Sequence, residues 1–116
     1  MKLLVNNIAA YAYTGTRAFV ASQPTAVFIH GAANDHSVWS LQSRYFAHHG
    51  WNVLAIDLPG HGQSDGPLCT SVPALAGWVA AFLDAAGVKG ATLIGHSMGS
   101  LTVLELAGQR PDLAAK

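Results

Sequence analysis

Short apolar runs alternate along the chain with longer segments in which apolar residues recur every three or four positions. The runs at Thr25–Ile29 and Trp51–Ile56 are continuous and apolar, which is typical of strands buried on both faces, and Ala91–Ile94 is a further apolar, β-prone run. The segments with a helical period lie between these runs and after the last one. The alternation predicts an α/β fold, in which a predominantly parallel sheet carries helices on both faces.

Three segments are predicted to form helices. They span Ser37–His49 before Gly50, Ser71–Ala86 before Gly87, and Ser100–Ala107 before Pro111. The apolar positions are Val38, Leu41 and Tyr45 in the first helix, and Leu75, Trp78, Phe82 and Ala86 in the second. Residues three and four apart share one face of a helix, so each stripe is expected to face the sheet.

The N-terminal region predicts additional short strands. Leu3–Val5 and Ile8–Tyr13 flank an Asn6-Asn7 turn, and Ala18–Ala21 is interpreted as a short third strand. The three tryptophans are expected in the core or between helices and sheet. They are Trp39, Trp51 and Trp78.

Composition narrows the class of protein. The 116 residues suffice for one domain at most, and 51% are hydrophobic while only 10% are charged. That charged fraction is low beside the roughly 25% of ordinary soluble domains. The formal net charge of +0 favours neither nucleic acid nor an anionic membrane surface as a partner. Cys69 is the single cysteine, so it predicts neither an internal disulfide nor a metal site.

No segment predicts a membrane span. The longest uncharged run, from Gly66 to Leu83, is interrupted by Pro67, Pro73 and Gly77. Met1–Val5 resembles the start of a signal peptide, but Asn6-Asn7 divides the apolar region. We therefore expect a cytoplasmic protein.

The motif Gly95-His96-Ser97-Met98-Gly99 is the strongest indication of chemistry. It lies between a predicted strand and a predicted helix, the context of a G-x-S-x-G nucleophile elbow. Gly95 and Gly99 are needed where strand and helix nearly touch, and Ser97 at the apex must adopt an unfavourable backbone conformation. The helix N-terminus behind Ser97 favours negative charge at this position.

Two further motifs follow predicted strands, and with them the chain resembles the α/β-hydrolase superfamily from Thr25 to Pro111. They are His30-Gly31-Ala32-Ala33 and the segment Asp57–Asp65. The resemblance implies that Ser97 attacks an acyl carbonyl of a small-molecule substrate, with the backbone N–H groups of Ala32 and Met98 as the oxyanion hole. Gly31 would let its loop approach the substrate, and Asp57–Asp65 would be a structural loop. No metal or organic cofactor is implied.

The base and the acid of a serine hydrolase are missing after Ser97. In this family the chain order is Ser, then Asp or Glu, then His, yet only Glu105 and Asp112 follow and no histidine does. All six histidines precede Ser97: His30, His36, His48, His49, His61 and His96. We therefore expect residues 1–116 to be the N-terminal portion of one hydrolase domain, ending after the helix that follows the elbow. The base and acid would lie beyond it, and the exposed sheet edge could pair with a second chain.

Alternative functions remain open from the sequence. The leading hypothesis is a serine hydrolase of ester or related acyl bonds, with this chain alone inactive. The same serine could instead serve an acyltransferase, a C–C hydrolase or a cofactor-free perhydrolase. A chain without its base could also be a non-catalytic truncated product or a binding subunit that completes its sheet with a partner. A serine at the elbow argues against dehalogenases and epoxide hydrolases, which use Asp there.

Overall fold

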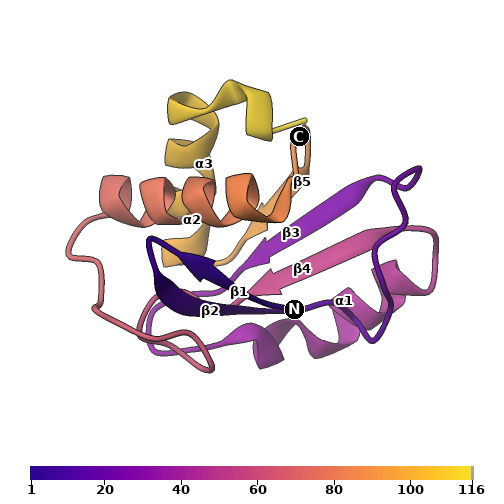
Figure 1. The fold of residues 1–116 in the computed structure, drawn as a ribbon, viewed down its shortest axis with the longest axis horizontal. Helices are drawn as coiled ribbons and strands as arrows, with labels where there is room; N and C mark the ends of the chain where they lie inside the picture. Colours follow the sequence, from indigo (N-terminus) through magenta and orange to yellow (C-terminus); the bar gives the residue numbers. More distant parts are fainter. Residues whose placement is uncertain (116) are drawn as a thin grey trace.

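The computed structural model describes residues 1–115 and contains one open, five-stranded sheet (Figure 1). The strands are β1 (Lys2–Val5), β2 (Ile8–Tyr13), β3 (Thr25–Ile29), β4 (Asn52–Ile56) and β5 (Thr92–Gly95). Their order across the sheet is β1-β2-β4-β3-β5. The pairings of β3 with β4 and with β5 are parallel, whereas β2 is antiparallel to β1 and to β4. The sheet is therefore mixed, and its parallel part consists of the strands predicted at the three apolar runs, β3, β4 and β5.

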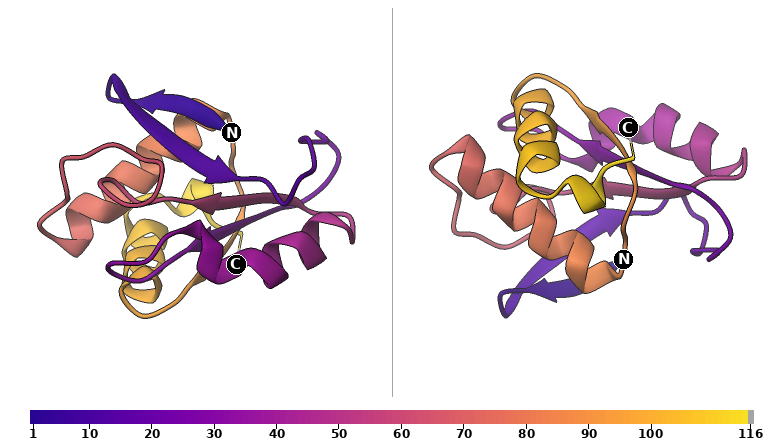
Figure 2. Two further views of the ribbon diagram at one scale, coloured as in Figure 1. Left: turned by 90° about the horizontal axis from the view of Figure 1, so that it is seen from below. Right: turned by 90° about the horizontal axis from the view of Figure 1, so that it is seen from above.

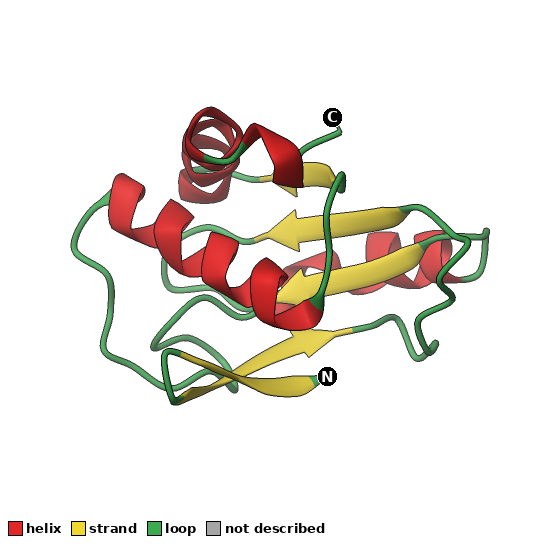
Figure 3. Ribbon diagram, turned by 45° about the horizontal axis from the view of Figure 1, so that its top comes forward, coloured by secondary structure: helices red, strands yellow, loops and turns green. Residues whose placement is uncertain are grey.

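The register aligns the ends of the three parallel strands. Ile29 of β3 lies opposite Ile56 of β4 and opposite Gly95 of β5. The loops that follow these strands consequently leave the sheet at one edge, as Figure 3 shows. In open α/β sheets, ligands bind at this carboxyl edge.

Helices cover both faces of the sheet (Figure 2). Helices α2 (Val72–Ala86) and α3 (Met98–Gln109) pack on one face, and α1 (Ser40–Ala47) packs on the other. Two single turns of 3₁₀ helix complete the described chain, η1 (His36–Trp39) before α1 and η2 (Pro111–Leu113) after α3. The predicted α/β class, with helices on both sides of the sheet, is confirmed.

The central strands are buried because each of their faces meets a helix layer. Successive side chains of a strand point to opposite faces. The side chains that point toward α2 and α3 are Val27, Ile29, Leu54 and Ile56. Those that point toward α1 are Ala26, Phe28, Val53 and Ala55. All eight are at most 2% exposed. Burying a large aliphatic or aromatic side chain contributes about 1.5–3 kcal/mol, so these strands dominate the core.

Helix α2 agrees with its sequence prediction. The Ser71 hydroxyl accepts a hydrogen bond from the Ala74 N–H at 3.2 Å, and Gly87 ends the helix with a φ of 72°. A left-handed conformation at this position is readily adopted by glycine. Leu75 and Phe82 are buried as expected, and Trp78 is partly buried against them.

The expected orientation of the first helix is wrong. Val38, Leu41 and Tyr45 are exposed by 45%, 78% and 62%, while Ser43 and Ala47 are buried. The buried face is selected by two aromatic residues, whose rings lie 5.2 Å (Trp39) and 5.5 Å (Phe46) from that of Phe28. The helix is also shorter than predicted, because its first turn is the 3₁₀ turn η1, capped by the Asp35 side chain.

The short strand expected at Ala18–Ala21 is absent from the described chain. This segment is irregular, and the backbone of Val20 bonds to the Asn52 side chain through its N–H (2.8 Å) and its carbonyl (2.9 Å). A side-chain amide thus satisfies backbone groups that a strand neighbour would otherwise pair.

Two features of the remaining surface bear on function. None of the helices in residues 1–115 is long and apolar enough to cross a membrane. Within the same residues, the outer side of β5 is paired only just before the strand, where Ala91 bridges Ala114 in parallel.

Candidate active site

The turn between β5 and α3 holds Ser97 in a strained conformation. Strand β5 ends at Gly95 and α3 begins at Met98, so only His96 and Ser97 lie between them. Ser97 has φ 57° and ψ −121°, which a non-glycine residue rarely adopts. It occupies the N-cap position of α3, yet its side chain is exposed and makes no capping hydrogen bond. The hydroxyl is therefore displayed at the carboxyl edge of the sheet.

The two glycines of the motif are required by close backbone contact. A Cβ atom on Gly95 would lie 2.6 Å from the Ser100 nitrogen and still closer to the Gly99 carbonyl. A Cβ atom on Gly99 would lie 2.8 Å from the His30 oxygen and overlap the Ile29 carbonyl. The sequence interpretation of both glycines is consistent with this geometry.

The loop after β3 lies directly against the elbow. A Cβ atom on Gly31 would be 3.3 Å from the Ser97 Cβ and 3.4 Å from the His96 oxygen. The N–H groups of Ala32 and Met98 donate to no other group within residues 1–115, so both donors are available to a ligand. The fold thus brings together the residues that the sequence marked in two separate motifs.

Two histidines tie the loop after β3 to the loop after β4. His30 Nε2 accepts the Leu58 N–H at 3.0 Å, which places its proton on Nδ1, and Nδ1 donates to the Gly31 carbonyl at 2.6 Å. His61 is bonded in the same way, because Nε2 accepts the Ala33 N–H at 3.2 Å and Nδ1 donates to the Pro59 carbonyl at 3.1 Å. Both rings are neutral in this arrangement.

The environment of His30 favours its neutral form. The residue is fully buried, and burial lowers the pKa of its imidazole, against smaller opposing effects such as the Gly31 hydrogen bond. The sequence places His30 and His61 in their loops but does not reveal that these side chains join the two loops. The available signal was their position just beyond two neighbouring parallel strands.

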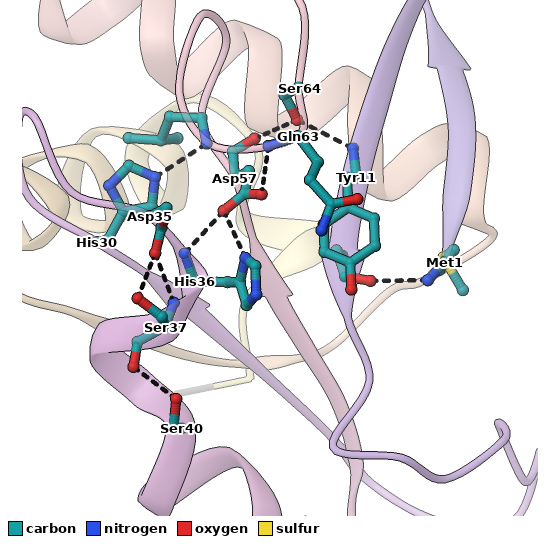
Figure 4. Close-up of polar contacts among 12 residues, drawn as sticks. Met1, Tyr11, His30, Asp35, His36, Ser37, Ser40, Asp57, Gln63 and Ser64 are labelled. Carbon is teal, nitrogen blue, oxygen red and sulfur yellow. Dashed lines mark hydrogen bonds and ion pairs between the residues drawn. The ribbon is translucent and has the colours of Figure 1, made fainter.

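Asp57 organises the loop after β4 (Figure 4). Its buried carboxylate accepts hydrogen bonds from the His36 N–H (2.7 Å), the His36 Nδ1 (2.9 Å) and the Gln63 N–H (2.8 Å). The Ser64 hydroxyl donates to the Asp57 carbonyl at 2.7 Å and accepts the Tyr11 N–H at 2.9 Å. These contacts fit the structural role expected of the segment Asp57–Asp65.

Asp35, His36 and Asp57 are the described residues that could hold a metal ion. One potential ligand atom from each lies within 4.8 Å of the others. The Asp57 oxygens are occupied by the three donors above, and one Asp35 oxygen accepts the Ser37 N–H at 2.8 Å. Within residues 1–115, the hydrogen bonds of these three side chains stabilise the turn before η1 and the loop after β4.

The histidine and acidic residues near the elbow have other partners. No side chain of residues 1–115 forms a hydrogen bond with the Ser97 hydroxyl, and the His96 ring lies edge-on to Trp39 at 6.5 Å. Glu105 accepts from Gln109 at 3.3 Å, and Asp112 pairs with Arg110 at 3.0 Å. Neither acid is bonded to Ser97.

An open α/β sheet with a G-x-S-x-G turn between a strand and a helix is the arrangement found in α/β hydrolases. This chain is a member of the alpha/beta hydrolase fold family, whose model matches residues 24–116. The assignment agrees with the resemblance recognised in the sequence.

Known relatives are considerably longer than this chain. It is 41% identical over 89 residues to the dihydrolipoyllysine-residue acetyltransferase component of the acetoin cleaving system of Cupriavidus necator, covering 76% of this chain and 24% of that protein. It is 33% identical over 91 residues to (E)-2-((N-methylformamido)methylene)succinate hydrolase of Acinetobacter baylyi, covering 78% and 34%. Among solved structures, a membrane phospholipase A described as a bacterial virulence factor superposes with a TM-score of 0.88 at 30% identity, covering 98% and 36%. The chain thus spans about a quarter to a third of these two curated relatives.

Proposed function

We propose that the protein hydrolyses ester or related acyl bonds with Ser97 as the nucleophile. The observation that carries this proposal is the strained, exposed Ser97 at the N-terminus of α3, in contact range of the Gly31 loop. Such strain is costly, and it clusters at sites where it serves function. The family assignment supports hydrolase chemistry in general.

The proposed reaction follows from the groups around Ser97. Its oxygen attacks the acyl carbonyl, while the N–H groups of Ala32 and Met98 stabilise the negative charge that forms on the carbonyl oxygen. Collapse of the tetrahedral intermediate expels the alcohol and leaves an acyl-Ser97 ester, which water then hydrolyses. The base that takes the serine proton, and the acid that orients it, are proposed to lie outside residues 1–116.

We further propose that residues 1–116 are the N-terminal portion of a single hydrolase domain. The support for this is the share of the relatives that the chain spans, 24% and 34% of two of them. One of these relatives is named as an acetyltransferase component and the other as a hydrolase. A hydrolase transfers the group to water, whereas an acyltransferase transfers it to another acceptor. An acyltransferase therefore remains the alternative within the family, because it needs the same serine and the same oxyanion donors.

We also propose a cytoplasmic location. The residues that resemble a leader are part of the sheet, since Lys2–Val5 forms β1 and the Met1 amino group donates to the Ala12 carbonyl at 2.8 Å.

The test is labelling with a fluorophosphonate probe, which reacts with activated serines. It is carried out on the natural polypeptide that contains this sequence, at the length measured by intact mass spectrometry. We expect a single label on Ser97 that Ser97→Ala abolishes, whereas Ser22→Ala, a change at an exposed loop serine, retains it. Absence of labelling in the wild-type polypeptide would refute the proposal.

The open edge of β5 favours a second candidate function, a non-catalytic subunit that completes its sheet with another chain. Leu101 and Leu104 of α3, the helix that follows β5, are exposed by 56% and 71%, and edge strands readily accept a further strand. This candidate predicts no probe label and a stable complex in gel filtration. A labelled Ser97 in a monomeric polypeptide would exclude it.

A further inference from the structure

We propose that a cavity of about 450 Å³ beside the oxyanion loop binds the uncharged, apolar acyl chain of the substrate. This inference rests on the proposed function, in which the acyl carbonyl of the substrate is the group that Ser97 attacks. Ala32 and Met98, the two residues whose N–H groups would hold the carbonyl oxygen, both line this cavity. A chain attached to the carbonyl carbon therefore has direct access to it.

The lining of the cavity selects an apolar occupant. Leu75 of α2 is 5% exposed and connects the cavity to the core, while Leu68 is 63% exposed at the surface. Cys69 lies between them in sequence and also lines the cavity. The volume is within the range of about 300–1,000 Å³ typical of small-molecule sites.

The cavity offers no charge to a ligand. Its lining contains no acidic side chain, lysine or arginine, and both ring nitrogens of His61 are used in backbone hydrogen bonds. Burial raises the pKa of the Cys69 thiol, which keeps this side chain neutral as well. A carboxylate or ammonium group would lose its hydration here without gaining a partner.

Retention of the acyl group explains why this part of the substrate occupies the cavity. In the proposed mechanism the alcohol leaves after the first step, whereas the acyl group stays bonded to Ser97 until water attacks. An apolar cavity adjoining the oxyanion donors would hold the acyl group in place during that interval.

Alkylation of Cys69 measures occupancy of the cavity without requiring catalysis. The reaction of the natural polypeptide with iodoacetamide is read on the peptide that contains Cys69 by mass spectrometry, because Cys69 is the single cysteine only within residues 1–116, and about pH 9 supplies thiolate. The probe ligand is 2-octanone, which combines a carbonyl group with an alkyl chain and has no leaving group. We expect it to slow alkylation about threefold or more, and 2-butanone at the same concentration to slow it less.

A displaced thiol provides the control for this measurement. In the double variant Cys69→Ser, Leu41→Cys the thiol lies on the exposed face of α1, outside the cavity lining. Here 2-octanone should leave the alkylation rate unchanged. Equal rates for Cys69 with and without 2-octanone would overturn the proposal.

Ester hydrolysis by the natural polypeptide then assigns the cavity to the acyl side. Cys69→Leu should lower the ratio of kcat/KM for p-nitrophenyl octanoate to that for p-nitrophenyl acetate about tenfold or more, because the larger side chain fills the cavity. The ratio for octyl acetate to ethyl acetate, which varies the alcohol, should change less. Leu41→Ala on the exposed face of α1 should alter neither ratio.

The outcomes separate this proposal from the proposed function. Hydrolysis with an octanoate-to-acetate ratio unmoved by Cys69→Leu would overturn the acyl cavity and leave Ser97 as the nucleophile. Protection of Cys69 by 2-octanone without any hydrolysis would support the cavity and contradict the hydrolase. A change confined to the alcohol series would overturn the assignment to the acyl side.

Discussion

The elbow and the two loops beside it reach the same edge of the sheet but are held by different forces. The elbow is positioned by backbone packing, because Gly95 allows β5 to approach Gly99 and Ser100 of α3, and Gly99 allows α3 to approach Ile29 and His30. The loops after β3 and β4 are positioned by polar side chains that accept backbone N–H groups: Asp57 and His30, which are buried, and His61, which is partly exposed.

This difference predicts two kinds of sensitivity to substitution. An added methyl group should disrupt the elbow, since backbone atoms cannot move aside as a side chain can. Loss of one acceptor atom should disrupt the loops, since buried donors would be left without partners.

Gly99→Ala should destabilise the protein most. The new Cβ would overlap the Ile29 carbonyl, and we expect a loss of about 3 kcal/mol in the free energy of unfolding, measured by urea denaturation. Gly108→Ala in the same helix is the matched control, because nothing lies within 4 Å of its Cβ position. That variant should gain about 0.5–1 kcal/mol from helix propensity. Similar losses in both variants would contradict packing as the cause.

Asp57→Asn should cost about 2 kcal/mol in the same assay. The substitution replaces a charged acceptor of three hydrogen bonds by an amide with one acceptor oxygen. Asp65→Asn, at an exposed position in the same loop, should change the free energy of unfolding by less than about 0.5 kcal/mol. Equal effects of the two changes would argue against the bonding role of Asp57.

Mild acid should weaken the fold through His30. Its pKa is lowered by burial, so below the unfolded value of about 6.5 the unfolded chain binds a proton that the folded chain does not. The contribution to stability is complete above pH 6.5 and is lost as the pH falls toward the folded pKa, by at most about 1.4 kcal/mol per pH unit. Urea denaturation across this pH range measures the slope, and NMR titration of the His30 ring assigns it. A His30 resonance that titrates at or above 6.5 would refute this prediction.

His61→Ala should have the smallest effect, about 1 kcal/mol, because it removes one acceptor at a partly exposed position. Hydrogen exchange at the Ala33 amide should accelerate, and His61→Gln should partly restore protection by supplying an acceptor oxygen. His49→Ala, just after α1, removes a ring that contacts Tyr45 and should leave exchange at Ala33 unchanged. Unaltered exchange in His61→Ala would show that the ring does not hold this loop.

Local signals in the sequence were sufficient for several parts of the molecule. Ser71 and Gly87 mark the ends of α2, and the spacing of Leu75 and Phe82 identifies its buried face. Gly95 and Gly99 likewise mark the elbow, because a motif of neighbouring residues dictates its own backbone geometry. The roles proposed for Ser97, Ala32 and Met98 stay predictions until the labelling experiment is done.

Orientation and long-range contact required the tertiary structure. The stripe of Val38, Leu41 and Tyr45 has a helical period, but the aromatic rings that meet Phe28 decided which face of α1 is buried. A helical period defines a face, whereas the partner of that face is set by residues distant in the chain.

The sequence by itself determined the class of fold and the position of the elbow, because periodicity, caps and a glycine motif act over a few residues. Only the tertiary structure decided that His30 and His61 join two loops, and that Cys69 lies in a cavity with Ala32 and Met98. These contacts link residues about 28 or more positions apart, as with His61 and Ala33. Parallel strands bring such residues to one edge of the sheet, and no local pattern records which of them will meet.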